Sequence, residues 1–257
     1  MIYGMKKFAI KHPIVLIVIV YIAKIFIFSF FRGVAERMCS PEANARGVDM
    51  DIGRLLSGGL LLLVFIRCFN FKKQFSGFVI MLPALLFALW TLLLHFLSKV
   101  TNVVPDHCGY AILSGLAPAV LEEIIYRGIF IYFLMANGKK PIAVLLISAL
   151  FFGLSHITYM IDKEMLSVLF QMSWATVIGL VLGAVYIKTG DLASVIIAHA
   201  AVDCCLNLFP IVGCIFPQYV VRTAAYGLMA VETWYAFWLI SRKSYSADLQ
   251  PPAIAEG

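Results

Sequence analysis

The sequence has 257 residues, of which 62% are hydrophobic and 13% are charged, and its mean hydropathy is +0.95. Soluble domains average about 45–50% apolar and about 25% charged residues, so this composition excludes an ordinary soluble domain and indicates a polytopic membrane protein. The formal net charge of +6 does not indicate a nucleic-acid partner. The Lys and Arg residues mostly lie at the ends of apolar runs and form no basic face with interleaved aromatic side chains.

Eight apolar stretches follow one another along the chain, each near the length of about 20 residues that a transmembrane helix needs. They predict an all-α fold, a bundle of about eight transmembrane helices around an intramembrane polar cavity. The second stretch is the weakest, because it is short and flanked by Arg54 and Arg67. The stretches lie at 13–31, 53–69, 76–97, 111–136, 141–160, 166–187, 192–210 and 218–240.

The first stretch follows Lys6, Lys7 and Lys11, as the apolar part of a signal peptide would. It is too long for a signal h-region, so we expect an uncleaved first span. Further along, the segment 137–141 (NGKKP) is typical of a helix stop, a basic turn and a proline restart. The segment 189–191 (TGD) is typical of a C-terminal glycine followed by an N-cap aspartate.

Basic residues gather on one side of the predicted membrane when the N-terminus is placed in the cytoplasm, so we expect both termini to be cytoplasmic. No internal repeat or linker marks a second domain. Residues 1–244 are therefore predicted to form a single transmembrane domain with a motif-bearing core at about 111–210, followed by a disordered tail at 245–257. The six cysteines show no CxxC spacing, which argues against a thiolate metal site. The sequence does not decide whether Cys39 and Cys108 form a disulfide.

The fourth stretch carries three ionisable side chains near its middle, Glu122, Glu123 and Arg127. Such groups cost about 2.5–3.5 kcal/mol each at that depth, so we expect them to face one another or a polar cavity at a functional site. Glu123 and Arg127 are four residues apart and can form an ion pair in the favourable order. Glu122 lies about 100° round the helix and is left to accept a proton from water. An ion-pair network that only locks helices together is the structural alternative.

Two later stretches add histidines. In the fifth, Phe152 and His156 share one helix face, and Gly153 permits a close approach of another helix. For His156 alone, a hydrogen-bonded contact near the membrane interface is an equal alternative. In the seventh, one polar stripe recurs every four residues, at His199, Asp203 and Asn207. A structural hydrogen-bond ladder is the alternative for this stripe, although such ladders add only modest stability in lipid.

These groups permit water activation by two routes, and the residues alone leave both open. In the first, Glu122 and His156 polarise a water while His199 and a neighbour stabilise the oxyanion that forms from a peptide carbonyl. In the second, a divalent metal such as zinc activates the water, so the cofactor is either such a metal or none. No HExxH helix is present, so a metal site would be assembled across helices from Glu122, His156, His199 and Asp203.

Three motifs in this order resemble those of the CAAX-protease and bacteriocin-processing (CPBP, or ABI) family of intramembrane proteases. They are Glu122-Glu123-x-x-x-Arg127, Phe152-x-x-x-His156 and His199-x-x-x-Asp203, within about 114–207. The resemblance implies a helical bundle of eight or a similar number of helices, and endopeptidase activity on membrane-associated protein or peptide substrates. It also implies that Glu122 and His156 activate water, while His199 and residue 203 stabilise the oxyanion. The supporting residues are then Glu123, Arg127, Phe152 and Asn207.

The chain departs from the family at Asp203, where the third motif often ends in Asn. An ionised carboxylate has no hydrogen to donate, so Asp203 would have to be protonated, bind metal or orient His199. Asn207, one turn later, is an alternative donor.

An intramembrane endopeptidase is thus the principal hypothesis. A non-catalytic immunity or regulatory membrane protein remains an alternative, as does a proton-coupled transporter, although the inverted repeats and interrupted helices of transporters are not evident. The expected partners are the lipid bilayer and a membrane-associated peptide or protein substrate. The expected location is a bacterial plasma membrane.

Overall fold

The computed structural model describes residues 10–65, 78–97, 108–161, 164–208 and 217–242, together with Phe8, Tyr245, Ser246 and Leu249. These residues form helices joined by turns, and no strand occurs among them. The all-α prediction is therefore confirmed. The ends of predicted spans at 66–69, 76–77 and 209–210 lie outside the described residues, as do Lys6 and Lys7.

Each predicted apolar stretch contains helix in the structure. Two short segments, η3 and η6, are 3-10 helices and η5 is a π-helix. In chain order the elements are α2 (Pro13–Met38), α3 (Pro41–Ala45), α4 (Val48–Phe65), α5 (Phe78–Met81), η3 (Leu82–Leu85), α6 (Leu86–Phe96), α7 (Cys108–Glu123), η5 (Ile124–Ile131), α8 (Tyr132–Ala136), α9 (Pro141–Leu154), η6 (Ser155–Ile161), α10 (Met165–Thr189), α11 (Leu192–Leu208) and α12 (Gln218–Ser241).

Three of the described helices are long and apolar enough to cross a bilayer, namely α2, α10 and the helix Pro141–Thr158 that continues α9 into η6. The segments Val79–Leu85 and Ala88–Phe96, bent by 41°, would together make a fourth. The eight predicted spans are therefore not confirmed as spans. Charge or length sets three of the predicted spans apart from these helices. The helix through 108–136 contains three charged side chains near its middle and α4 contains three, whereas α11 has only 17 residues.

The predicted helix boundaries at two turns are confirmed. Pro141 is the first residue of α9, where its missing N–H costs nothing, and Gly138 before it has a φ of +80°. Gly190 ends α10 in the left-handed conformation, with a φ of +70°. Asp191 then caps α11, because its carboxylate accepts a hydrogen bond from the Ser194 backbone N–H at 3.0 Å.

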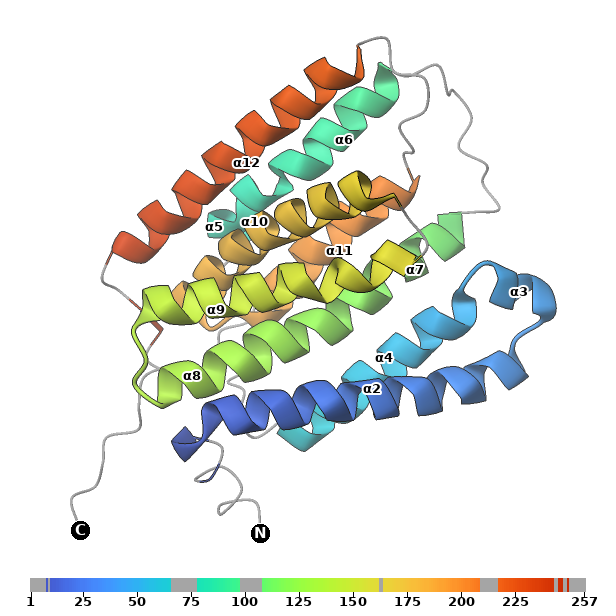
Figure 1. Cartoon of the computed structure of the whole chain (residues 1–257), viewed down its shortest axis with the longest axis horizontal. Helices are drawn as coiled ribbons and strands as arrows, with labels where there is room; N and C mark the ends of the chain where they lie inside the picture. The colour runs from blue at the N-terminus through green and yellow to red at the C-terminus, as the bar shows by residue number, and fades with distance from the viewer. Residues whose placement is uncertain are drawn as a thin grey trace.

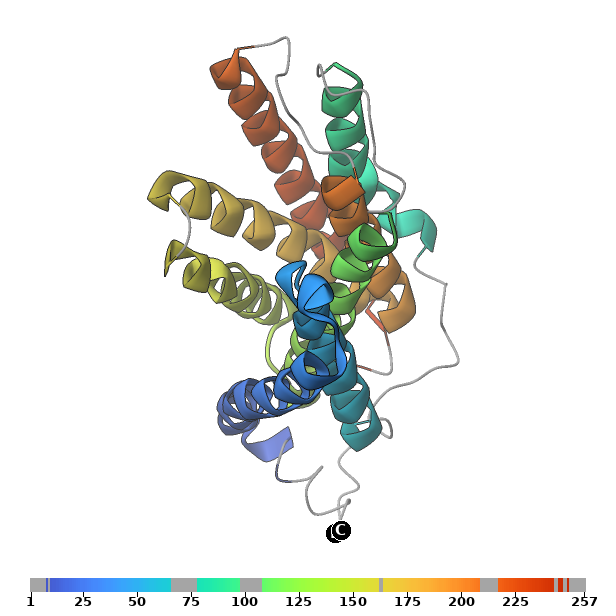
Figure 2. The same cartoon turned by 90° about the vertical axis from the view of Figure 1, so that its right-hand side faces the viewer.

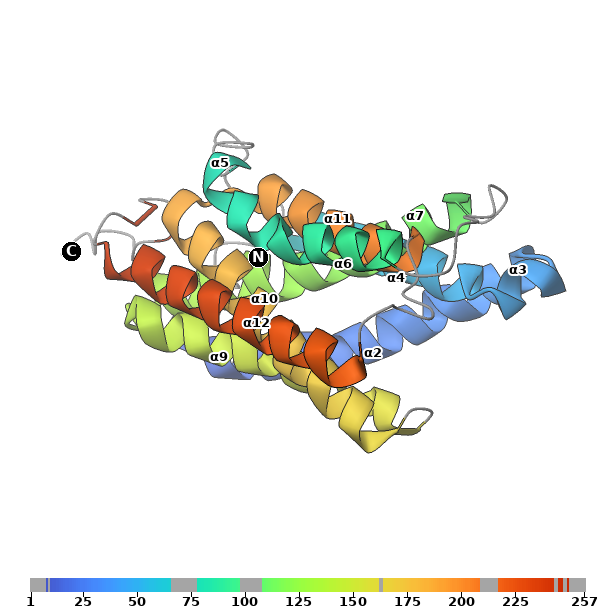
Figure 3. The ribbon, with the colours of Figure 1, turned by 90° about the horizontal axis from the view of Figure 1, so that it is seen from above.

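The helices are arranged so that α2 and α4 lie side by side along one side of the molecule, while α6 and α12 form the opposite side (Figure 1). The helices α7 to α11 lie between these two pairs, as the view turned by 90° also shows (Figure 2). Seen from above, α6 lies over α11 and α12 lies over α10 (Figure 3), and both pairs are in contact. The segment α7–η5–α8 is central, and every residue from Glu123 to Ala136 is buried.

Two glycines allow the central helices to pack closely. A Cβ on Gly115 of α7 would stand only 2.6 Å from the backbone nitrogen of Cys204 in α11. A Cβ on Gly153 of α9 would overlap the Thr176 side chain of α10. The close helix approach predicted at Gly153 is therefore confirmed. It allows α9 to pack directly against α10.

The π-helix η5 follows directly after the two glutamates of α7. A π-helix closes its turns by i→i+5 hydrogen bonds, so it widens the helix and shifts the side chains relative to an α-helix. The hydroxyl of Ser148 on α9 donates to the backbone carbonyl of Tyr126 at 3.0 Å, inside this segment. A buried polar contact from a second helix thus supports an irregular backbone at the centre of the protein.

The start of the segment expected to be a disordered tail is packed in the structure. The backbone N–H of Ser246 donates to the carbonyl of Ile187 in α10 at 3.1 Å, and Leu249 is buried. The tail beyond these residues lies outside the described part of the chain. Cys39 and Cys108, whose pairing the sequence leaves open, are both free thiols.

Candidate active site

The buried ion pair predicted within the central helix is present. The Arg127 Nη1 donates to Glu123 Oε1 at 2.6 Å, and both side chains have no solvent exposure. Arg127 also donates through Nη2 to the backbone carbonyl of Gly179 in α10, at 3.3 Å. The pair therefore joins the central helix to α10 as well as closing on itself.

Glu123 has a second partner, from α11. The Nδ1 atom of His199 lies 2.8 Å from Glu123 Oε1, which already accepts from Arg127. A carboxylate that pairs with an arginine can only accept hydrogen bonds, so Nδ1 carries the proton in this contact. The bond fixes the ring and directs Nε2 away from Glu123. Glu123 thus orients a histidine 76 residues away in the chain.

The other ring nitrogen of His199 faces the remaining carboxylates. Its distance to Asp203 Oδ2 is 3.4 Å, and its distance to Glu122 Oε2 is 4.0 Å. The first and third sequence motifs therefore meet at this nitrogen. Asn207, one turn further along α11, is exposed, and no hydrogen bond or ion pair joins it to these groups within the described residues.

Phe152 of the second motif lies in the middle of these groups. The Cζ atom of Arg127 stands 4.7 Å from the centre of the Phe152 ring. The rings of His156 and His199 lie edge-on to it, with centroids at 5.4 and 5.5 Å. Phe152 therefore contacts the cation and both histidines, and these contacts set the spacing between the three motif helices.

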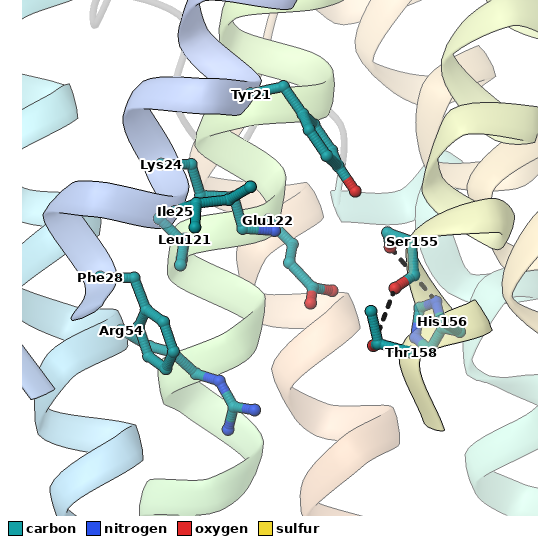
Figure 4. Close-up of a pocket in the computed structure, with 10 residues that line it drawn as sticks. All are labelled: Tyr21, Lys24, Ile25, Phe28, Arg54, Leu121, Glu122, Ser155, His156 and Thr158. Atoms are coloured by element: carbon teal, nitrogen blue, oxygen red, sulfur yellow. Dashed lines mark hydrogen bonds between the residues drawn. The ribbon is translucent and has the colours of Figure 1, made fainter. Parts of the chain in front are cut away.

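A cavity of about 340 Å³ opens beside the motif residues (Figure 4). Glu122 and His156 both line it, from α7 and η6, and the Glu122 carboxylate points into it. The Nδ1 atom of His156 lies 3.0 Å from the Phe152 carbonyl, which can only accept, so this nitrogen carries the ring proton in that bond. The structure thus brings Glu122 and His156 to one cavity and His199 to the Glu122 carboxylate.

Five polar residues of this cavity were not among the predicted site residues: Tyr21 and Lys24 on α2, Arg54 on α4, and Ser155 and Thr158 on η6. A signal for Lys24 exists in the sequence, because a lysine within the first apolar stretch is itself an intramembrane charge. No comparable signal marks Arg54, since it stands at the edge of a weak stretch.

The possible metal ligands do not assemble into a metal site. Across the described ranges, no three His, Cys, Asp or Glu side chains are grouped so that they could hold one ion. The described residues therefore form no metal site in this arrangement, and the chemistry proposed below is built from protein side chains and water.

Apolar helices around a cluster of carboxylates, histidines and an arginine, in which Glu123, Arg127 and His199 are buried, define the chain as an integral membrane protein with a polar internal site. Residues 104–205 match the family model described as Type II CAAX prenyl endopeptidase Rce1-like. This match contains all three motifs, confirms the resemblance predicted from them and implies a protease. Comparisons with curated proteins and with solved structures find no match.

Proposed function

We propose that the chain is an intramembrane endopeptidase in which Glu122 is the general base. The observation that carries this proposal is the position of the Glu122 carboxylate, which points into a polar cavity beside His156 and lies 4.0 Å from His199 Nε2. Peptide hydrolysis by activated water needs a base and groups that orient the water and stabilise the oxyanion. The site offers a carboxylate, a histidine on the same cavity and a second histidine held by a buried carboxylate.

In the proposed reaction, a water between Glu122 and the scissile carbonyl loses a proton to Glu122 as its oxygen bonds to the carbonyl carbon. The carbonyl oxygen becomes an oxyanion. It accepts a hydrogen bond from Nε2 of His199 when the ring carries a proton on both nitrogens, since Nδ1 already donates to Glu123. Glu122 then gives its proton to the departing amine, and the C–N bond breaks. The acceptor nitrogen of His156 orients the attacking water from the η6 side of the cavity.

The remaining motif residues act on these groups. Glu123 holds the His199 ring through Nδ1, and Arg127 compensates the Glu123 charge in a fully buried position. Asp203 Oδ2 lies 3.4 Å from His199 Nε2 and can pair with that ring when the ring is charged, whereas an ionised carboxylate has no hydrogen to donate to the oxyanion. We therefore assign Asp203 the orienting role, and we assign Asn207 no role at the site.

The family match and the location of the site support a proposal for the substrate class. The matched model is described as that of CAAX prenyl endopeptidases, and the cavity lies among apolar helices. We therefore propose a membrane-associated peptide or protein as the substrate, with a lipid-modified C-terminal tail as the form to test first.

The test uses the purified full chain reconstituted into phospholipid vesicles, with a farnesylated peptide that ends in a CAAX sequence and carries a fluorophore and quencher on either side of the expected cleavage site. Glu122→Gln preserves shape and removes the base, so kcat is expected to fall about 10²–10⁴-fold with little change in KM. Glu36→Gln, at an exposed position near the end of α2, is the matched control and is expected to cleave like the wild type. Wild-type rates in Glu122→Gln would overturn the proposal.

A further inference from the structure

Two cations face the catalytic carboxylate across the cavity. Lys24 of α2 and Arg54 of α4 line the same space as Glu122, and the Arg54 guanidinium points into it (Figure 4). Lys24 interacts electrostatically with both Glu122 and Arg54. Both cations lie outside residues 104–205, which match the family model. This part of the cavity wall therefore comes from the N-terminal helices of the chain.

Each cation is held in place by other groups. Arg54 Nη1 lies 2.7 Å from Asp51 Oδ1, and the other oxygen of Asp51 accepts from Ser114 at 2.6 Å. The Lys24 ammonium lies 5.5 Å from the centre of the Tyr21 ring and 6.0 Å from that of Tyr126. A guanidinium has five N–H donors, so the bond to Asp51 leaves donors on Arg54 for a further acceptor.

The cavity wall carries two cations and one carboxylate among its lining residues, namely Lys24, Arg54 and Glu122. Arg54 is compensated by Asp51, whereas Lys24 faces the charge of Glu122 until Glu122 takes the proton from water and the negative charge moves to the attacking oxygen. An anionic group on the substrate would then pair with Lys24 and with the donors that Asp51 leaves on Arg54. A carboxylate matches the hydrogen-bonding geometry of a guanidinium.

We propose that Lys24 and Arg54 form a subsite that binds a carboxylate of the substrate peptide on the C-terminal side of the scissile bond. This proposal rests on the endopeptidase function proposed above and adds the recognition of an anion to it. The carboxylate has two sources in a peptide, the C-terminal α-carboxylate and an acidic side chain near the terminus. Lys24 and Arg54 would act as specificity residues by pairing with the negative charge of the substrate. They need no contact with the attacking water or the scissile carbonyl.

The experiment compares three versions of the fluorogenic peptide in the reconstituted protein: one with a free C-terminus, one with a C-terminal amide, and one with the amide and an aspartate as the last residue. Wild-type protein is expected to show a KM about 10–100-fold lower for the free acid than for the plain amide, as expected for one charge-assisted hydrogen-bonded contact. If the amide with aspartate recovers the low KM, the side chain serves as the source; if it does not, the α-carboxylate is the source. Either result supports an anion subsite.

Variants then assign the preference to the two cations. Lys24→Met and Arg54→Met are each expected to raise KM for the free acid about 10–100-fold and to leave KM for the amide within about threefold. Lys24→Arg keeps the charge and is expected to keep most of the preference. Lys140→Met and Arg37→Met, at exposed positions outside the cavity, are matched controls with wild-type KM values for both peptides.

The outcomes separate this inference from the proposed function. Equal KM values for acid and amide peptides in the wild type, with cleavage still lost in Glu122→Gln, would overturn the subsite and leave the protease intact. An equal rise in KM for both peptides in Lys24→Met would also overturn the subsite. Absence of any Glu122-dependent cleavage would instead contradict the proposed function itself.

Discussion

The buried pair of Glu123 and Arg127 gives a prediction that the structure makes quantitative. Arg127→Met removes the cation but leaves the Glu123 carboxylate with no exposure and with His199 as its remaining described partner. Leaving one member of a buried ion pair uncompensated costs about 3–5 kcal/mol. One kcal/mol shifts the melting temperature of a chain of this size by about 2–4 °C, so the melting temperature should fall by about 6–20 °C.

Removing the Glu123 charge as well should rescue the stability of Arg127→Met. Adding Glu123→Gln to Arg127→Met removes both charges, and replacing a buried pair by uncharged groups is often close to neutral. The amide oxygen of the introduced glutamine can still accept from His199 Nδ1. The double variant should therefore regain most of the lost stability, to within about 1–2 kcal/mol of the wild type.

The assay is thermal unfolding of the detergent-solubilised protein, followed by intrinsic fluorescence, with Arg37→Met as the matched control. Arg37 is exposed at the end of α2, so its replacement should leave the melting temperature unchanged. A melting temperature for Arg127→Met within about 2 °C of the wild type would refute the view that this pair holds the site together. So would a double variant that is less stable than Arg127→Met.

Three further predictions concern the packing and the third motif. Gly153→Ala should destabilise the protein by about 1–3 kcal/mol, because its Cβ meets the Thr176 side chain, and Thr176→Ala should recover part of the loss in the same melting assay. Ser148→Ala should cost about 1–3 kcal/mol in that assay, because the buried carbonyl of Tyr126 loses the Ser148 hydroxyl as a donor. An unchanged melting temperature would show that this hydrogen bond does not stabilise the π-helix. Asp203→Asn should keep kcat within about tenfold in the peptide assay, since an acceptor remains, whereas Asp203→Leu should lower it about 100-fold; equal rates for the two would exclude the orienting role.

Much of the fold could be predicted from the sequence because the helix signals are local. Apolar length fixes where helices form, and Pro141 and Gly190 mark boundaries through the missing N–H and the left-handed backbone. Whether each helix crosses the membrane is a different question. The helix that contains Glu122, Glu123 and Arg127 has charges that only neighbouring helices can compensate, so its apolar length alone does not establish a span.

The site could be predicted in part for the same reason. The spacing of four residues predicted the contact between Glu123 and Arg127, because a helix brings such residues together by its own geometry. It could not predict the bond from His199 to Glu123, since that depends on how α11 packs on α7 over a separation of 76 residues. The π-helix η5 shifts side chains between these helices and also depends on tertiary contacts. Lys24 is visible in the sequence as an intramembrane charge, but neither it nor Arg54 could be assigned to the site, because no local pattern shows which helix faces the cavity.

The central claim, that Glu122 of this membrane protein drives peptide-bond hydrolysis, is tested most directly in cells. Membranes from cells that express the wild type are compared by mass spectrometry with membranes from cells that express Glu122→Gln at the same level. The measured quantity is the set of new peptide termini among membrane-associated proteins. We expect termini that occur with the wild type and with Glu36→Gln but disappear with Glu122→Gln. Identical sets of termini in all three membranes, with the protein present in equal amounts, would contradict hydrolysis by Glu122.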